Sequence, residues 1–294
     1  MTVAPADLAL LAGPDVRKGG VRTYIRRHPT IVIGAGLLGL MALMAVFAPY
    51  LGTVDPQALS PIRRLRWPSA QYWFGTDMLG RDIYSRVVYG ARVSLLVGFS
   101  VALLSSVIGL AIGLVSGFVR WADGVIMRVM DGLMSIPPIL LAVALMALTR
   151  GSVQNVITAI TVAEIPRVSR LVRGVVLSLR EQPYVDAAVA AGTRTPAIIL
   201  RHILPNTLAP MTVQATYICA GAMIIEAILS FIGAGTPPTI PSWGNIMAEG
   251  RALWQVKPFI IFFPALFLSV TVLAVNLLGD GLRDALDPRM AKEY

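Results

Sequence analysis

Long runs of hydrophobic residues without charge recur along the chain and set its predicted architecture. Residues 30–53 and 93–119 contain no charged side chain, and each run reaches the roughly 20 residues that a helix needs to cross a bilayer. Four further hydrophobic runs contain few charges. The pattern predicts an all-α polytopic membrane protein with six transmembrane helices, at about 30–51, 93–119, 124–148, 152–174, 208–232 and 258–280.

Polar segments between these runs divide the chain into parts. The expected parts are a cytoplasmic N-terminal segment (1–29), a first transmembrane helix (30–51), an extracytoplasmic loop (52–92), a core with five transmembrane helices (93–283) and a cytoplasmic C-terminal tail (284–294). All five tryptophans fall near predicted helix ends, where aromatic residues meet the membrane boundary. We expect the first hydrophobic run to remain in the protein, because it is too long for the apolar part of a signal peptide.

Residues 180–210, called the elbow segment below, combine start and stop signals for two short helices. Pro183 suits the first turn of a helix, and Gly192 suits the position just beyond a helix end. Thr195 repeats the start signal as an N-cap, and Pro205 predicts a second stop. We therefore expect two helices with a bend between them, at about 183–191 and 196–204. Four alanines keep the first helix thin enough for another protein to approach closely.

Composition supports the membrane assignment. The chain is 56% hydrophobic and 14% charged, whereas soluble domains are about 25% charged. A net charge of +9 would suggest nucleic-acid binding in a soluble protein. In a multi-pass protein of the cytoplasmic membrane, the same charge reflects the basic residues of cytoplasmic loops, and we expect no nucleic-acid partner. An even number of spans then places both termini and the elbow segment on the more basic, cytoplasmic side.

The sequence contains no pattern for catalysis or metal binding. The phosphate-binding loop G-x-x-x-x-G-K-[ST] is absent, so the chain itself should not hydrolyse ATP. Two histidines and one cysteine are too few for a histidine-rich metal site, a cysteine-based metal site or an intrachain disulfide. We expect neither an enzyme nor a cofactor bound by this chain.

Small residues recur every four positions in the second predicted span, at Ser105, Gly109, Gly113 and Gly117. On a helix they share one face, which lets a neighbouring helix approach closely where lipid provides no hydrophobic driving force. That neighbour is either a helix of a partner subunit or another helix of this chain. The sequence leaves both interpretations open.

Three polar residues inside predicted spans are candidates for a translocation path. Glu226 lies deep in the fifth span with no basic residue within a helical turn, and ionisable groups at that depth usually face a cavity or another protein segment. The alternative for Glu226 is a protonated carboxyl hydrogen-bonded to a neighbouring helix. Asp131 and Ser135 lie one turn apart, just before two prolines that should bend the third span. The alternative for Asp131 is a solvated residue near the cytoplasmic end.

The elbow segment resembles the cytoplasmic coupling loop of ATP-binding-cassette (ABC) importer permeases. In that family the loop reads Glu-Ala-Ala, three residues, Gly, nine residues and then Ile-x-Leu-Pro. The same spacing occurs here in Asp186-Ala187-Ala188, Gly192 and His202-Ile203-Leu204-Pro205. Two positions differ, since Asp replaces Glu and His replaces the first Ile. Beyond this loop, residues 30–290 resemble the dipeptide, oligopeptide and nickel branch of the family through Phe74-Gly75-Thr76-Asp77, Gly80-Arg81-Asp82, Ser85-Arg86, Leu229-Ser230-Phe231, Pro241-Ser242-Trp243-Gly244, Asn276-Leu277-Leu278-Gly279-Asp280 and Leu286-Asp287-Pro288-Arg289.

This resemblance implies the core of a type I importer with several partners. A sister permease subunit would enclose the path with this chain, one or two ATPase subunits would bind ATP and Mg, and an extracytoplasmic substrate-binding protein would deliver the substrate. Peptides are the expected substrate, and nickel chelates or haem are alternatives within the family. The resemblance assigns contact with the ATPase to Tyr184, Asp186, Ala187, Ala188, Gly192, His202, Ile203, Leu204 and Pro205.

Two other functional classes compete with this interpretation. A self-sufficient secondary transporter or channel predicts an inverted repeat, and the sequence shows no convincing one. An intramembrane enzyme would need a nucleophile with a base, or a metal site, within the spans, and none occurs there. An ATPase that copurifies with the chain would support the importer, whereas uptake by the isolated chain would support the secondary transporter.

Overall fold

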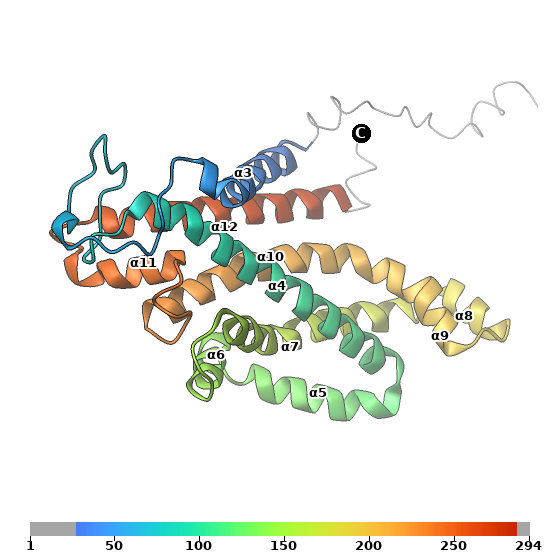
Figure 1. The fold of residues 1–294 in the computed structure, drawn as a ribbon. Helices are drawn as coiled ribbons and strands as arrows, with labels where there is room; N and C mark the ends of the chain where they lie inside the picture. The colour runs from blue at the N-terminus through green and yellow to red at the C-terminus, as the bar shows by residue number, and fades with distance from the viewer. Residues whose placement is uncertain (1–27, 287–294) are drawn as a thin grey trace, which may run out of the picture.

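The computed structural model describes residues 28–286, which form an elongated bundle of helices (Figure 1). No β-strand occurs within this range, and a single isolated bridge joins Thr76 and Asp82. The all-α fold class is therefore confirmed for the described residues. Most of the predicted N-terminal segment and the last eight residues of the chain lie outside this range.

The described residues form α-helices of very different lengths and one π-helical turn. In chain order they are α3 (Pro29–Val46), α4 (Ile83–Phe118), α5 (Arg120–Met134), α6 (Pro138–Ala147), α7 (Val153–Leu179), α8 (Pro183–Ala190), α9 (Thr195–Ile198), a π-helical turn (Ile199–Ile203), α10 (Leu204–Phe231), α11 (Trp243–Gly250) and α12 (Phe259–Leu286). Three single 3-10 turns lie at Ala48–Tyr50, Pro61–Arg63 and Arg251–Leu253.

The predicted count of six spans is not fully confirmed. Among the described residues, four helices are long and apolar enough to cross a membrane: α3, α4, the continuous helix Thr195–Phe231 and α12. The predicted third span is broken, because α5 and α6 meet at an angle of 85° next to the adjacent prolines, and this pair makes a fifth span if it is counted as one. The predicted fourth span corresponds to α7, which has 27 residues but also several charged side chains.

Three glycines of α4, at positions 109, 113 and 117, pack against α7 within this chain. A Cβ atom built on any of them would lie 2.5–2.7 Å from a valine Cβ of α7. The contacts pair Gly109 with Val168, Gly113 with Val172 and Gly117 with Val176. Of the two interpretations of the small-residue pattern, the structure therefore supports internal packing, because these glycine faces are already occupied by α7.

We predict that Gly113→Ala destabilises the protein by about 1–3 kcal/mol, because the new methyl group would force α4 and α7 apart. The nearest atoms are the Val172 Cβ at 2.6 Å and the Ser169 carbonyl oxygen at 2.8 Å. Gly36→Ala in α3 is the matched control, since a Cβ there meets nothing within 4 Å. The control should be neutral or stabilising by up to about 1 kcal/mol, as expected from helix propensity. Thermal unfolding in detergent measures the stability of both variants. Equal changes in melting temperature would contradict the close packing of α4 against α7.

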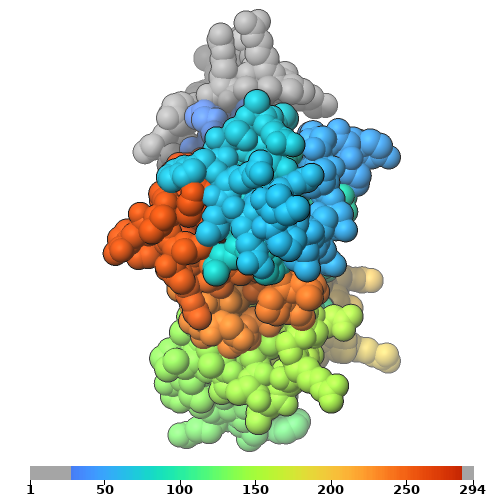
Figure 2. Space-filling view, turned by 60° about the vertical axis from the view of Figure 1, so that its left-hand side comes forward, coloured from blue at the N-terminus to red at the C-terminus, as the bar shows by residue number. Residues whose placement is uncertain are grey.

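The loop between α3 and α4 covers one end of the bundle. Figure 2 shows this loop, in blue and cyan, in contact with the orange C-terminal part of the chain. The Trp67 ring lies 5.2 Å from the Phe259 ring, and the Lys257 ammonium lies 4.4 Å above the same indole. The Gln57 side chain donates to the Thr239 carbonyl at 3.1 Å. The loop is thus held in place by aromatic, cation–π and hydrogen-bond contacts to residues nearly 200 positions away.

One tryptophan predicted to lie at the membrane boundary is buried inside the bundle. Trp243 begins α11 and is 0% exposed. Its indole N–H donates to the Val87 carbonyl of α4 at 3.0 Å. The prediction of a boundary position is therefore wrong for Trp243, because its ring fills the core where α11 packs against α4.

Candidate functional site

The first helix of the elbow segment is α8, which lies with α9 at one end of the molecule (Figure 1). Pro183 occupies its first turn, as predicted. Val185 is 2% exposed and belongs to the hydrophobic core, whereas Tyr184 and Val189 are 42% and 56% exposed. The helix therefore buries one side against the bundle and presents the other side outward.

Gly192 ends this helix in a Schellman motif. Its φ angle is +75°, and its N–H donates to the Val189 carbonyl at 2.9 Å. The next N–H, of Thr193, donates to the Ala188 carbonyl at 3.1 Å, which completes the paired bonds of this helix end. A Cβ on Gly192 would meet nothing within 4 Å. The requirement for glycine is therefore set by the backbone angle and not by crowding.

The second predicted helix of the elbow segment is not a separate element, and Pro205 does not end it. The chain passes from α9 through the π-helical turn directly into α10, so that Thr195–Phe231 is one helix of 37 residues. Pro205 lies in the first turn of α10. A proline inside an α-helix clashes with the carbonyl four residues earlier, and the wider π turn that precedes it accommodates the ring.

The structure brings most of the residues assigned to ATPase contact into one small region. The rings of Tyr184 and His202 lie 6.2 Å apart, which links α8 to the π turn. Asp186, Ala187, Gly192 and Pro205 are exposed, Ala188, His202 and Leu204 are half-buried, and Ile203 is 0% exposed. Ile203 therefore holds the segment in the core, and the exposed members form its outer surface.

A cavity of about 440 Å³ lies between α8 and the end of α4. Arg180 borders it and donates from Nη1 to the Gly117 carbonyl at 3.1 Å. This bond satisfies a terminal carbonyl of α4 and ties the end of α7 to α4. The cavity is lined by Phe118, Arg120, Arg180, Glu181, Val185, Asp186 and Val189.

Two of the predicted path residues lie at the bend between α5 and α6. Asp131 accepts a bond from Arg170 Nη2 of α7 at 2.5 Å, and both side chains are more than half exposed. The Ser135 hydroxyl is exposed and donates to the Gly132 carbonyl at 2.7 Å. Asp131 is therefore both accessible to solvent and paired across two helices.

The third predicted path residue is enclosed by the chain. Glu226 is 0% exposed, and its Oε1 accepts a bond from the Ser230 hydroxyl at 2.8 Å. The network continues from Ser230 to Thr236 and from there to the Asn245 amide of α11, at 3.2 and 2.8 Å. In this conformation the carboxyl group therefore belongs to a buried polar network that joins α10 to α11.

Sequence reasoning missed a buried ionic cluster at the loop-covered end of the bundle. Arg81 and Arg86 both donate to Asp77 at 2.7 Å. Glu249 of α11 also accepts from both arginines, with Arg81 Nη2 at 2.5 Å and Arg86 Nη2 at 3.0 Å. Arg86 and Asp77 are each 1% exposed. The sequence could have indicated only the pairing of Asp77 with Arg81, because these two residues are four positions apart. The contribution of Glu249 could not be predicted, because it lies far away in sequence.

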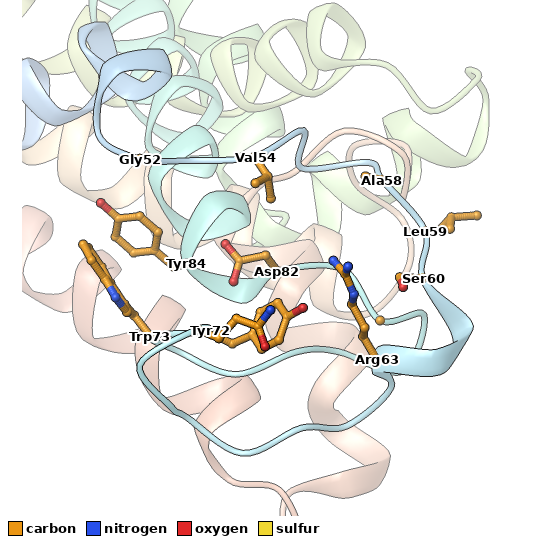
Figure 3. Close-up of a pocket in the computed structure, with 12 residues that line it drawn as sticks. Gly52, Val54, Ala58, Leu59, Ser60, Arg63, Tyr72, Trp73, Asp82 and Tyr84 are labelled. Atoms are coloured by element: carbon orange, nitrogen blue, oxygen red, sulfur yellow. The ribbon is translucent and has the colours of Figure 1, made fainter.

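A second cavity, of about 420 Å³, lies within the loop between α3 and α4. Figure 3 shows Trp73 and Tyr84 side by side at one edge, with Arg63 and Asp82 also bordering the space. The two aromatic rings lie 4.8 Å apart. Asp82 accepts from the Ser85 backbone N–H at 2.8 Å and so caps α4. This cavity is formed by the loop itself and is separate from the elbow segment.

Comparisons with known proteins agree with this architecture. Residues 105–292 match the family described as binding-protein-dependent transport system inner membrane component. Residues 20–68 match the N-terminal transmembrane domain of oligopeptide transport permease C. An inward-facing structure of the MetNI methionine ABC transporter gives a TM-score of 0.57 at 22% identity, and the match covers 69% of this chain and 96% of that one. This structural likeness establishes a fold of the type I importer class.

Several curated relatives resemble the chain over nearly its whole length. A probable peptide ABC transporter permease of Sinorhizobium fredii is 52% identical, with 94% of each chain covered. The dipeptide transport system permease DppC of Alkalihalophilus pseudofirmus is 42% identical over 90% of this chain and 88% of its own. The glutathione transport system permease GsiD of Escherichia coli is 40% identical over 96% of both. The chain therefore belongs to the family of binding-protein-dependent transport system inner membrane components, the multi-pass permeases of ABC transporters.

Proposed function

We propose that this chain is one permease subunit of an ATP-driven importer for peptides. The proposal rests on family membership together with the names of the relatives, which include peptide, dipeptide and glutathione permeases. Peptides of a few residues are the substrate class common to these names. The chain would enclose the translocation path together with a sister permease subunit.

The partners follow from this role. One or two ATPase subunits bind ATP and Mg and supply the energy, so that the chain itself is not an enzyme and carries no cofactor. An extracytoplasmic substrate-binding protein delivers the peptide. Both termini and the elbow segment lie in the cytoplasm, as the distribution of basic residues favours.

The observation that supports contact with an ATPase subunit is the form of the elbow segment. A helix of eight residues such as α8 is marginal in isolation, yet here it is fixed by buried Val185 and by the glycine turn that follows. Its other side faces away from the described part of the chain. We infer that this side docks into a groove of an ATPase subunit, in the manner of a helix placed in a groove.

Force applied to α8 would reach several spans at once. The helix follows α7 after three residues and precedes the continuous helix Thr195–Phe231. The bond from Arg180 to the Gly117 carbonyl links α4 to the end of α7, so that α4 would move as well. Closure of the ATPase dimer would thus move α4, α7 and α10 together and switch the path between inward- and outward-facing arrangements.

The candidate path residues differ in their access to a passing substrate. Asp131 and Ser135 are exposed at the bend of α5 and α6, so a passing substrate can meet them in the present conformation. Glu226 is enclosed. It would border the path only in a conformation in which α10 and α11 separate.

Cross-linking from a single cysteine tests the ATPase contact. With Cys219 replaced by alanine, Ala187→Cys on the exposed side of α8 should cross-link to an ATPase subunit in membranes that contain the whole transporter. Gln57→Cys in the loop between α3 and α4 is the matched control, since it is also exposed but lies at the opposite end of the bundle. Adducts with the ATPase from Gln57→Cys, or none from Ala187→Cys, would contradict the docking and the topology.

A further inference from the structure

The exposed positions of α7 differ in kind from those of the other long helices. Each of α3, α4, α10 and α12 exposes several large hydrophobic side chains, as a helix in contact with lipid should. Within the described residues, α7 exposes no large hydrophobic side chain at all. Its exposed positions are Gln154, Thr158, Arg167, Arg170, Gly174 and Ser178.

Four of these positions lie on one face of the inner half of α7. Arg167, Arg170, Gly174 and Ser178 follow one another at spacings of three and four residues, which keeps them on the same side of a helix. A Cβ on Gly174 would meet nothing within 4 Å, so the space in front of this face is open.

Depth in the membrane does not account for this polar face. The neighbouring helix α4 runs beside α7 at the same depth, so its exposed residues can be compared with those of α7. The contacts of Gly109 with Val168 and of Gly117 with Val176 place α4 and α7 in parallel and fix their register. Their register places Val115 of α4 level with Gly174 of α7, and Val115 is 46% exposed.

The same register gives two further pairs at equal depth. Ile108, 39% exposed, lies level with Arg167, and Ala111 lies level with Arg170. At each of these levels α4 therefore exposes an apolar side chain where α7 exposes a polar side chain or a glycine. The two outward faces of this helix pair are suited to different surroundings.

The neighbouring helix α5 continues the polar face of α7. Asp131 of α5 accepts from Arg170 at 2.5 Å, with the two side chains 56% and 51% exposed. Gly132 of α5 is also exposed, and a Cβ added to it would meet nothing within 4 Å. Charged groups of both signs thus lie at this surface, where hydrocarbon contact would be costly.

We propose that the inner half of α7, residues 167–178, lines a water-filled passage together with Asp131 of α5, while the outward face of α4 contacts lipid. The inference rests on the proposed permease function and names α7 as the wall that a peptide meets on the inner side. The charged termini of a peptide are compatible with a wall that carries both arginine and aspartate.

Thiol reactivity at matched depth tests this assignment. In a chain with Cys219 replaced by alanine, Gly174→Cys and Val115→Cys are compared in inside-out vesicles that hold the whole transporter. A cationic, membrane-impermeant methanethiosulfonate reacts with thiolates, which form in water and not in lipid. We expect labelling at Gly174→Cys to be faster by a factor on the order of ten or more.

Labelling after denaturation confirms that both thiols are present, and peptide uptake by intact cells that express the same variant reports separately on the permease function. An unreactive Gly174→Cys would overturn the passage, because the face would then be covered by protein or lipid. Equal rates at the two positions would also overturn it, because both helices would then lie in water at that level. Either result can occur with a variant that still imports peptide into intact cells, so failure of this inference is distinct from failure of the proposed function.

Discussion

Glu249→Ala should destabilise the protein by about 3–5 kcal/mol, the range observed when one partner of a buried ion pair is removed. The change leaves two arginines with Asp77 as their remaining carboxylate partner in the cluster, and Arg86 is 1% exposed. Because Glu249 is the member contributed by α11, its loss also removes the ionic link between that helix and the start of α4. Thermal unfolding of the purified protein in detergent measures the effect.

Glu181→Ala is the matched control for this substitution. Glu181 is exposed in the turn that follows α7, and surface substitutions away from special features change stability by less than about 0.5 kcal/mol. Equal melting temperatures for Glu249→Ala and Glu181→Ala would show that the cluster contributes little to holding α11 in place.

Gly192→Val should uncouple ATP hydrolysis from uptake in the assembled transporter. Valine is disfavoured at a φ angle of +75°, and strain of this kind costs about 1–3 kcal/mol. The turn would relax toward another conformation and displace α8 from the position from which force enters the spans. ATPase activity and peptide uptake, measured on the same proteoliposomes, should show hydrolysis retained and uptake lowered.

Gly192→Asn separates the backbone angle from other effects at this position. Asparagine visits the left-handed region more readily than other non-glycine residues, and the space around Gly192 admits a side chain. Uptake should therefore be largely kept with Asn and lost with Val. Normal coupling in Gly192→Val would argue against α8 as the lever.

Local signals predict part of the elbow segment and fail at a specific point. Pro183 and Gly192 act within a single turn, so the start and end of α8 follow from residue type alone. The same reasoning predicts that Pro205 ends a second helix. The structure instead keeps the helix continuous through a π turn, and this stretch is held in the core by buried Ile198 and Ile203.

Charged residues are the least predictable part of the chain. Arg81 and Arg86 lie in the predicted extracytoplasmic loop, on the side of the membrane where fewer basic residues are expected. Their role emerges only when Glu249 of α11 is brought to them from more than 160 residues away. In the same way, the pairing of Arg170 with Asp131 requires α5 and α7 to lie side by side.

The sequence by itself determined the helical class, the membrane location and the position of the elbow segment, because hydropathy and turn chemistry act over short stretches of chain. The tertiary structure decided which surfaces meet. It packed Gly109, Gly113 and Gly117 of α4 against α7, enclosed Glu226, and left the polar side of α7 open. These outcomes depend on contacts between residues far apart in sequence, so no local pattern of hydrophobic and polar positions contains them.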